Sequence, residues 1–449
     1  MNAYTAKNNG KDLIKAFSPV QIIGPFQKFF NKIVSGSYPL FIAAIIALFW
    51  ANFFGESYHS VWHTELAFSI GSFHISKSLL HWINDALMTI FFFVVGLEIK
   101  RELLVGELAS IKKAILPIAA AIGGMLVPGA IYAVLNYNTA AASGWAIPMA
   151  TDIAFSLAVL AIVGKKIPFG IRIFLSAFAI ADDLGAVLII AVFYTQSIAW
   201  NYIMISLVLI GSLALANLLW IRWTLVYALL GICIWVAIMG SGIHATIAGV
   251  IVALFIPAKG RYDTRTFIDK VNASLNQFDC KVECGHTILL NKDHQSAVQN
   301  IELACHDVET PLQRLFHGLD IWVAFLILPL FALSNAGVSL DIENISYAMT
   351  HPVGLGILLG LVLGKPLGIT LFTFLAVKLL KVPLLSGIHW HHIIGASMLG
   401  GIGFTMSLFI SGLSFSSFEL IEISKIGILS ASILSGIFGI TVLKLNIKL

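Results

Sequence analysis

Long apolar runs recur along the whole chain, and they constrain its fold more than any other feature. We find twelve such runs, at 38–54, 79–101, 114–135, 145–163, 171–194, 202–220, 224–240, 242–257, 318–337, 353–377, 391–413 and 425–444. A helix of about 20 apolar residues crosses the hydrocarbon core of a bilayer, and backbone groups in lipid must bond within their own segment. The sequence therefore predicts an all-α polytopic membrane protein with 12 transmembrane helices.

The composition agrees with a membrane protein and excludes other classes. Hydrophobic residues make up 58% of the 449 residues, and the mean hydropathy is +0.92. Charged residues make up only 11%, against a typical share of about 25%. So few charges cannot cover the surface of a soluble enzyme of this length, and a net charge of +4 is too small to indicate an anionic partner. We expect a lipid bilayer as partner and no nucleic acid.

Lysine and arginine gather in alternate connections, which predicts the orientation of the chain. They lie in the N-terminal arm, in the second, fourth, sixth, eighth and tenth connections, and at the C-terminus. On the other side stand only Lys77 and, at the start of the last span, Lys425. Both termini are therefore expected in the cytoplasm. The predicted organisation is a cytoplasmic arm, spans 1–8, a cytoplasmic polar insertion and spans 9–12, over residues 1–37, 38–257, 258–313 and 314–449.

Two connections have features of their own. Residues 65–76 alternate around Gly71-Ser72, which predicts a small β-hairpin on the outer face. Because an exposed strand edge can pair with a second copy of itself, we predict a homodimer contact there. The insertion 258–313 holds cysteines and histidines that are compatible either with a zinc site or with a solvated segment bearing reduced thiols; these are Cys280, Cys284, Cys305, His286, His294 and His306.

Four charged residues lie near the middle of predicted spans: Asp152, Asp182, Asp183 and Lys365. A charge at the bilayer centre costs at least about 2.5 to 3.5 kcal/mol. One explanation is that the charges only lock helices together. However, three carboxylates against one ammonium leave negative charge that needs a cation or protons, and intramembrane ionisable residues are usually functional.

The adjacent aspartates point about 100° apart on a helix, so one can reach Lys365 while the other faces a cavity. Carboxylate oxygens suit Na⁺ or Li⁺, and only the deprotonated form binds a cation. Protons and the cation then compete for the same oxygens.

Spans 4 and 11 carry residues that break helices. Pro148 precedes Thr151 and Asp152 in span 4, and Gly395, Gly400, Gly401 and Gly403 interrupt span 11. Interrupted spans at matching positions of two halves indicate a transporter site. Here they are the middle members of two three-helix repeats, spans 3–5 and 10–12, which start from opposite sides and would be inverted. The alternative for the glycines is close helix packing. Half-helix ends carry partial charge, which Asp152 and Lys365 could neutralise.

Together these residues resemble the bacterial NhaA-type sodium/proton antiporters. The similarity covers nearly all of the chain apart from the N-terminal arm and the insertion. It is carried by the blocks Trp82-Ile-Asn-Asp-Ala-Leu-Met88, Val95-Gly-Leu-Glu-Ile-Lys-Arg-Glu-Leu103, Trp145-Ala-Ile-Pro148, Ala150-Thr-Asp-Ile-Ala-Phe155, Asp182-Asp-Leu-Gly-Ala186, Ser241-Gly-Ile-His-Ala-Thr246, Asn335-Ala-Gly-Val-Ser339, Gly364-Lys-Pro-Leu-Gly368 and Gly401-Ile-Gly-Phe-Thr-Met-Ser407.

The resemblance implies a secondary transporter of the bacterial inner membrane, without enzymatic activity or cofactor. It would exchange intracellular Na⁺ or Li⁺ electrogenically for external protons, under pH regulation, in sodium and pH homeostasis. Asp183 would be the main cation ligand, and Asp182 would pair with Lys365 and join the exchange. Thr151 and Asp152 would lie where the broken helices cross.

The resemblance also implies residues outside this core. Asp85 and Glu98 would line the cytoplasmic access to the site, with Arg101 and Glu102 in a pH-responsive region. His244 matches a histidine tied to pH response, although it could equally be a residue packed beside Gly242.

The start of span 9 departs from the family pattern. Phe316 stands where an acidic residue is expected and Asp320 where a histidine is expected, while His317 is kept. The pH sensor is therefore the part that the resemblance does not define.

Two other function classes fit less well. An intramembrane aspartyl protease needs aspartates on two facing helices with a Gly-x-Gly-Asp signature, whereas Asp182 and Asp183 are contiguous. A cation channel uses rings of carbonyls or carboxylates around a pore axis. One asymmetric Asp-Asp-Lys cluster in a chain with inverted repeats favours a carrier.

Overall fold

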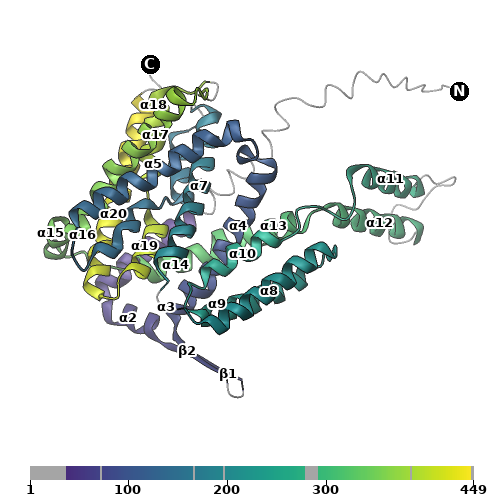
Figure 1. Cartoon of the computed structure of the whole chain (residues 1–449), viewed down its shortest axis with the longest axis horizontal. Helices are drawn as coiled ribbons and strands as arrows, with labels where there is room; N and C mark the ends of the chain where they lie inside the picture. The colour runs from purple at the N-terminus through teal and green to yellow at the C-terminus, as the bar shows by residue number, and fades with distance from the viewer. Residues whose placement is uncertain are drawn as a thin grey trace.

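A computed structural model describes residues 37–70, 73–164, 167–195, 198–278, 292–384 and 387–445. The described chain is mostly helical, and its helices form one bundle (Figure 1). A two-stranded hairpin projects from one end of this bundle, and α18 lies toward the opposite end (Figure 1). Most of the predicted N-terminal arm, 1–37, lies outside the described residues.

Nine segments of the described chain are long and apolar enough to cross a membrane. Four of them contain a change of helix type: α3 (Leu79–Trp82), η2 (Ile83–Leu87) and α4 (Met88–Val105); η4 (Ala142–Met149) and α6 (Ile153–Val163); α13 (Pro311–Trp322), η7 (Val323–Ile327) and α14 (Leu328–Asn335); and α16 (Pro352–Leu359), η8 (Gly360–Gly364) and α17 (Lys365–Leu379). The other five are α5 (Ile111–Leu135), α7 (Phe169–Phe193), α8 (Trp200–Leu218), α9 (Thr224–Ser241) and α20 (Phe418–Leu445).

Two further pairs pass the same test only together, because each is bent. The helix Ser37–Phe53 turns by 115° into α2 (Gly55–His63), and α18 (Trp390–Gly400) turns by 44° into α19 (Phe404–Ser414). The eighth apolar run, 242–257, forms only the ten-residue helix α10 (Thr246–Phe255), about 15 Å long. The described residues thus hold nine to eleven candidate spans, and α10, in the eighth of the twelve predicted spans, is not among them.

The small β-hairpin is confirmed. Strands β1 (Glu65–Ile70) and β2 (Phe73–Ser78) pair antiparallel, in a register that runs from Glu65 opposite Ser78 to Ile70 opposite Phe73. This register leaves Gly71 and Ser72 between the strands, as the alternation of the sequence predicts. We call the end of the bundle that bears these strands the hairpin end.

Spans 3 and 10 approach each other more closely than any side chain would allow. A Cβ added to Gly123 on α5 would lie 2.2 Å from the carbonyl oxygen of Gly368 on α17, and one added to Gly368 would lie 2.0 Å from that of Gly123. Small residues permit such backbone contact between membrane helices. The contact brings together the first helices of the two predicted repeats. Helix α7, which is largely buried, packs against α5 as well.

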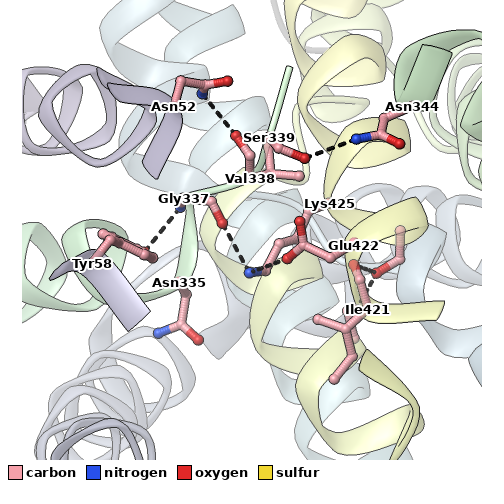
Figure 2. A network of polar contacts seen from close by, with 12 residues as sticks. Asn52, Tyr58, Asn335, Gly337, Val338, Ser339, Asn344, Ile421, Glu422 and Lys425 are labelled. Atoms are coloured by element: carbon pink, nitrogen blue, oxygen red, sulfur yellow. Dashed lines mark hydrogen bonds and ion pairs between the residues drawn. The ribbon is translucent and has the colours of Figure 1, made fainter. Parts of the chain in front are cut away.

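A polar network anchors the segment that follows α14 at the hairpin end (Figure 2). The Tyr58 hydroxyl donates to the carbonyl of Leu333 and accepts from the Gly337 N–H, at 3.0 and 3.1 Å. From the other side, Lys425 of α20 donates to the Gly337 carbonyl at 3.0 Å and pairs with Glu422 at 3.1 Å. The segment therefore ties α2 to the start of the last span.

The insertion forms a pair of helices beside the bundle (Figure 1). Helices α11 (Thr264–Leu275) and α12 (Lys292–Val308) pack against each other, and the short turn η5 (Asn276–Phe278) follows α11. Asp263 caps α11, since its carboxylate accepts the Thr266 N–H at 2.9 Å. Cys280, Cys284 and His286 lie outside the described residues, so the zinc site stays a prediction. The remaining helices are the short η3 (Glu107–Ala109) and α15 (Ile342–Thr350).

Candidate functional site

Two interrupted helices cross inside the bundle. The backbone is extended at Ala150 and Asp152, between η4 and α6, and residues 401–403 separate α18 from α19. The Asp152 N–H donates to the Ile402 carbonyl at 2.7 Å, and the Thr151 hydroxyl donates to the Gly400 carbonyl at 2.9 Å. Each break thus supplies polar groups that satisfy the other, as unpaired backbone within a membrane requires.

Asp152 caps the N-termini of both half-helices that leave the crossing. One carboxylate oxygen accepts the Phe155 N–H of α6 at 3.0 Å. The other accepts the Thr405 N–H at 3.0 Å and the Thr405 hydroxyl at 2.5 Å. A carboxylate is favourable at a helix N-terminus because the unpaired N–H groups there carry partial positive charge. The side chain is 2% exposed, so these contacts replace water around it.

Two serines bind across the crossing in matching ways. Ser156 on α6 donates to the Leu399 carbonyl of α18, and Ser407 on α19 donates to the Ile147 carbonyl of η4, both at 2.8 Å. Each serine stands three residues after the first residue of its half-helix. The two halves of the crossing therefore bind each other reciprocally.

Lys365 lies beside the crossing, at the first residue of α17. Its ammonium is 2.7 Å from the Asp182 carboxylate, and both side chains are fully buried. The ammonium also donates to the carbonyl of Met149 at the end of η4. The C-terminal carbonyls of a helix carry partial negative charge, so Lys365 faces a negative helix end as Asp152 faces positive ones.

Asp183 points elsewhere, to a cavity of about 100 Å³. Asp152, Thr405 and Glu98 line the same cavity. Asp183 is 2% exposed, and its Oδ1 has no hydrogen-bond partner among the described residues. A volume of this size, with several polar groups on its wall, is sufficient for a few water molecules at about 30 Å³ each. The Oδ1 of Asp182 also has no hydrogen-bond partner among the described residues. The two aspartates differ in what they face, because Asp182 contacts the ammonium and Asp183 lines the cavity.

Glu98, Arg101 and Glu102 gather near the end of α4. The Arg101 guanidinium is 3.5 Å from Glu98 and 3.2 Å from Glu102, and it stacks over the Phe316 ring at 5.0 Å. The neighbouring Lys100 donates to the carbonyls of Leu254 and Ile256, where α10 ends before the insertion. We call this the insertion end of the bundle. Glu98 also lines the cavity that Asp183 lines, so its ion pair with Arg101 connects this group to the cavity wall.

Asp85 does not join that group. It forms an ion pair with Lys77 of β2 at 2.8 Å, at the hairpin end. Asp85 and Glu98 are thirteen residues apart on one continuous helical segment, which corresponds to roughly 20 Å. The resemblance implies that both line one access path. The structure places Glu98 on the wall of the Asp183 cavity and Asp85 beside Lys77, so it does not bring the two residues together.

The two predicted histidines also lie apart from the cavity. His244, between α9 and α10, is within electrostatic range of Asp85 and Lys77, and so belongs to the hairpin end. His317 is exposed, with its ring 5.8 Å from that of Phe316, and it is absent from the described cavity wall.

Comparison with known proteins gives the family. The family described as Na⁺/H⁺ antiporter 1 matches residues 27–443. The chain belongs to the Na⁺/H⁺ antiporter 1 family. It is 47% identical over 421 residues to Na⁺/H⁺ antiporter NhaA 1 of Saccharophagus degradans, which covers 93% of this chain and 91% of that one. It is 44% identical to the NhaA antiporter of Oleidesulfovibrio alaskensis, over 95% of both chains. A Helicobacter pylori NhaA antiporter is 47% identical over 89% of this chain and 90% of its own.

Several polar groups that bind at the helix crossing were not predicted from the sequence as site residues. Thr405 binds Asp152 twice but was noted only as part of a glycine-rich block; its place just past the second break was the available signal. Ser156 and Ser407 were not singled out, although each follows a break at the same spacing. The Met149 carbonyl bears no sequence signal, because every residue has one.

Proposed function

We propose that this multi-pass membrane protein exchanges Na⁺ or Li⁺ for protons at Asp183, with Asp182 taking part in the exchange. The observation that carries the proposal is the carboxylate oxygen of Asp183 that has no hydrogen-bond partner among the described residues and lies in a cavity that Glu98 and Asp152 also line, next to a carboxylate already paired with Lys365. If these carboxylates served only to hold helices together, we would expect every carboxylate oxygen to have a hydrogen-bond partner. An oxygen that faces a cavity instead offers a ligand position.

Competition follows from charge. When all four groups are ionised, the three carboxylates exceed the one ammonium by two negative charges; the carboxylates are those of Asp152, Asp182 and Asp183, and the ammonium is that of Lys365. Carboxylate oxygens are suitable ligands for hard cations, and a proton on the oxygen prevents that binding. If two protons replace one cation, each cycle moves one net charge. We therefore infer that exchange is electrogenic, with more protons than cations moved per cycle.

Alternating access would come from two inverted repeats, spans 3–5 and 10–12, in a chain of 12 spans. Two observations support this division: the reciprocal bonds of Ser156 and Ser407 across the crossing, and the mutual contact of Gly123 and Gly368 between the leading helices. In such transporters one bundle moves against the other around a fixed midplane site. Asp152 and Lys365 would hold the helix ends electrostatically balanced during that movement.

The insertion end would face the cytoplasm of a bacterial inner membrane, with both termini on that side. The basic connections favour this orientation. The two lysines that oppose it, Lys77 and Lys425, each have a carboxylate partner, Asp85 and Glu422, so neither presents an unbalanced charge to the outer side. Residues 1–37, 38–257, 258–313 and 314–449 would then be the arm, spans 1–8, the cytoplasmic insertion and spans 9–12.

Regulation and assembly complete the proposal. Glu98, Arg101 and Glu102 would form part of the pH response, since Arg101 pairs with both carboxylates and Glu98 lines the cavity of Asp183. The exposed edge of the β-hairpin would pair with a second copy in a homodimer. The physiological role would be sodium and pH homeostasis.

The test is Asp183→Asn in proteoliposomes, with Na⁺-dependent proton flux as the readout. This isosteric change removes the ionisable oxygen, so we expect flux driven by Na⁺ or Li⁺ to be abolished. Asp269→Asn, an exposed position on α11, is the matched control and should retain wild-type flux. Flux that saturates with Na⁺ and reverses with an imposed pH gradient distinguishes a carrier from a channel. Full activity of the Asp183 variant would refute the assignment of the site.

A further inference from the structure

Helix α13 contributes two residues to the wall of the Asp183 cavity, Phe316 and Asp320. They are four residues apart and so lie on the same face of the helix, one turn from each other. Four residues correspond to roughly 6 Å along the axis. Since α13 enters the bundle from the insertion, Asp320 is the deeper of the two.

Position 316 does not supply charge to this cavity. Phe316 is 3% exposed and lies beneath the Arg101 guanidinium, 5.0 Å from it. Arg101 in turn is bound by Glu98 and Glu102. The aromatic ring thus helps to hold a cation that two carboxylates already neutralise.

Asp320 brings an additional carboxylate to the wall. It is partly exposed, and it lies close enough to Glu98 for the two to interact electrostatically. The charged groups that line the cavity are therefore Glu98, Asp152, Asp183 and Asp320, and Arg101 pairs with Glu98 from outside the lining. Much of the remaining wall is apolar, from Phe91, Val94, Val95, Val323 and Leu328. A cleft of one charge sign with low-dielectric walls concentrates the field and raises the local concentration of counter-ions.

We propose that Asp320 is an affinity-determining residue for the transported cation: it concentrates monovalent cations between Glu98 and Asp183 and thereby lowers the KM for Na⁺ on the insertion side. The inference rests on the proposed function. Asp320 supplies the negative charge of α13 to the cavity wall, one helical turn beyond the uncharged Phe316. Its effect is on arrival of the cation, so it changes KM and leaves the maximal rate, which depends on Asp183 and the moving bundle, unchanged.

The test compares Asp320→Asn with wild type in everted membrane vesicles, in which added Na⁺ meets the cytoplasmic side. Loss of one nearby carboxylate charge should raise the KM for Na⁺ about fivefold at low ionic strength, with Vmax unchanged. Added choline chloride should bring the wild-type KM toward that of the variant, because salt screens partly exposed charges. Asp320→Glu, which keeps the charge, should retain the wild-type KM, and so should the charge-matched control Asp269→Asn on α11.

An unchanged KM in Asp320→Asn would overturn the inference, and so would a fall in Vmax at constant KM, which indicates a structural role. If that variant does not reach the membrane, Asp320→Ser carries the same comparison. Failure of the proposed function has a different signature: Asp183→Asn would then retain full flux, whatever the KM of the Asp320 variants.

Discussion

Replacing Lys365 with methionine should destabilise the protein strongly, because it removes one partner of a fully buried ion pair. Methionine keeps the length and most of the volume of lysine but carries no charge. The Asp182 carboxylate, 2.7 Å from the ammonium in the wild type, would stay buried without its cation. The Met149 carbonyl would lose the same donor.

The expected magnitude follows from the geometry. Two unit charges at 2.7 Å attract each other by about 6 kcal/mol at an effective dielectric constant near 20, and desolvation of both groups offsets much of this. Removal of one partner of a buried pair is nonetheless destabilising by about 3 to 5 kcal/mol, since the other charge remains uncompensated. Removing both charges should be far less harmful. The double variant Asp182→Asn/Lys365→Met should therefore be more stable than Lys365→Met alone.

The assay is a double-mutant cycle on the purified protein in detergent. Apparent unfolding midpoints are recorded by tryptophan fluorescence at one fixed heating rate, because large membrane proteins often unfold irreversibly. Lys378→Met is the matched control: it makes the same substitution at an exposed lysine near the end of the same helix, α17. A Lys365→Met midpoint equal to that of the control would refute the reasoning. So would a double variant as unstable as Lys365→Met, because the two charges would then be uncoupled.

Two further predictions concern packing and the insertion. Gly368→Ala would place a Cβ 2.0 Å from the Gly123 carbonyl oxygen, so α5 and α17 must separate. We expect this variant to have a lower unfolding midpoint and reduced Na⁺-dependent proton flux. The control is Gly211→Ala on α8, which should behave as wild type in both assays because nothing lies within 4 Å of its Cβ. The hydrogen bond from Thr266 lowers the pKa of the Asp263 carboxyl in the folded protein. The cap therefore stabilises α11 fully at pH values above the unfolded pKa of about 3.9. This stabilisation is lost as the pH falls through the lower pKa of the folded state. Amide exchange over residues 264–267 should accelerate in that acidic range in wild type but not in Asp263→Ala, which exchanges quickly throughout; equal profiles would contradict the assigned cap.

The features that could be predicted from the sequence are those with a large energetic penalty behind them. A helix satisfies its backbone groups within lipid, so most of the apolar runs correspond to candidate spans. The alternation around Gly71-Ser72 predicted the hairpin. The 100° between adjacent helical residues also separated the directions of Asp182 and Asp183. The expectation that one would meet Lys365 and the other a cavity agrees with the observed contacts.

The remaining features of the fold and the site could not be predicted from the sequence, because they depend on backbone carbonyls or on the residues at which helices begin and end. The Met149 and Leu399 carbonyls, which accept from Lys365 and Ser156, have no sequence signature. The eighth run forms only a short helix because the chain turns at its first residue, Gly242, which has a positive φ of 85°, and α10 begins at Thr246. A hydropathy window does not register such a turn. The ion pair between Asp85 and Lys77 could not be read either, because Lys77 lies on a strand and not on a span.

The central claim is that one buried carboxylate pocket holds either a cation or protons. Calorimetric titration of the purified protein with NaCl, in buffers of different ionisation enthalpy and at several pH values, tests it most directly. Na⁺ binding should release protons into the buffer, and its affinity should fall as pH decreases; Asp183→Asn should bind no Na⁺. Binding that releases no protons and keeps the same affinity at every pH would contradict the account.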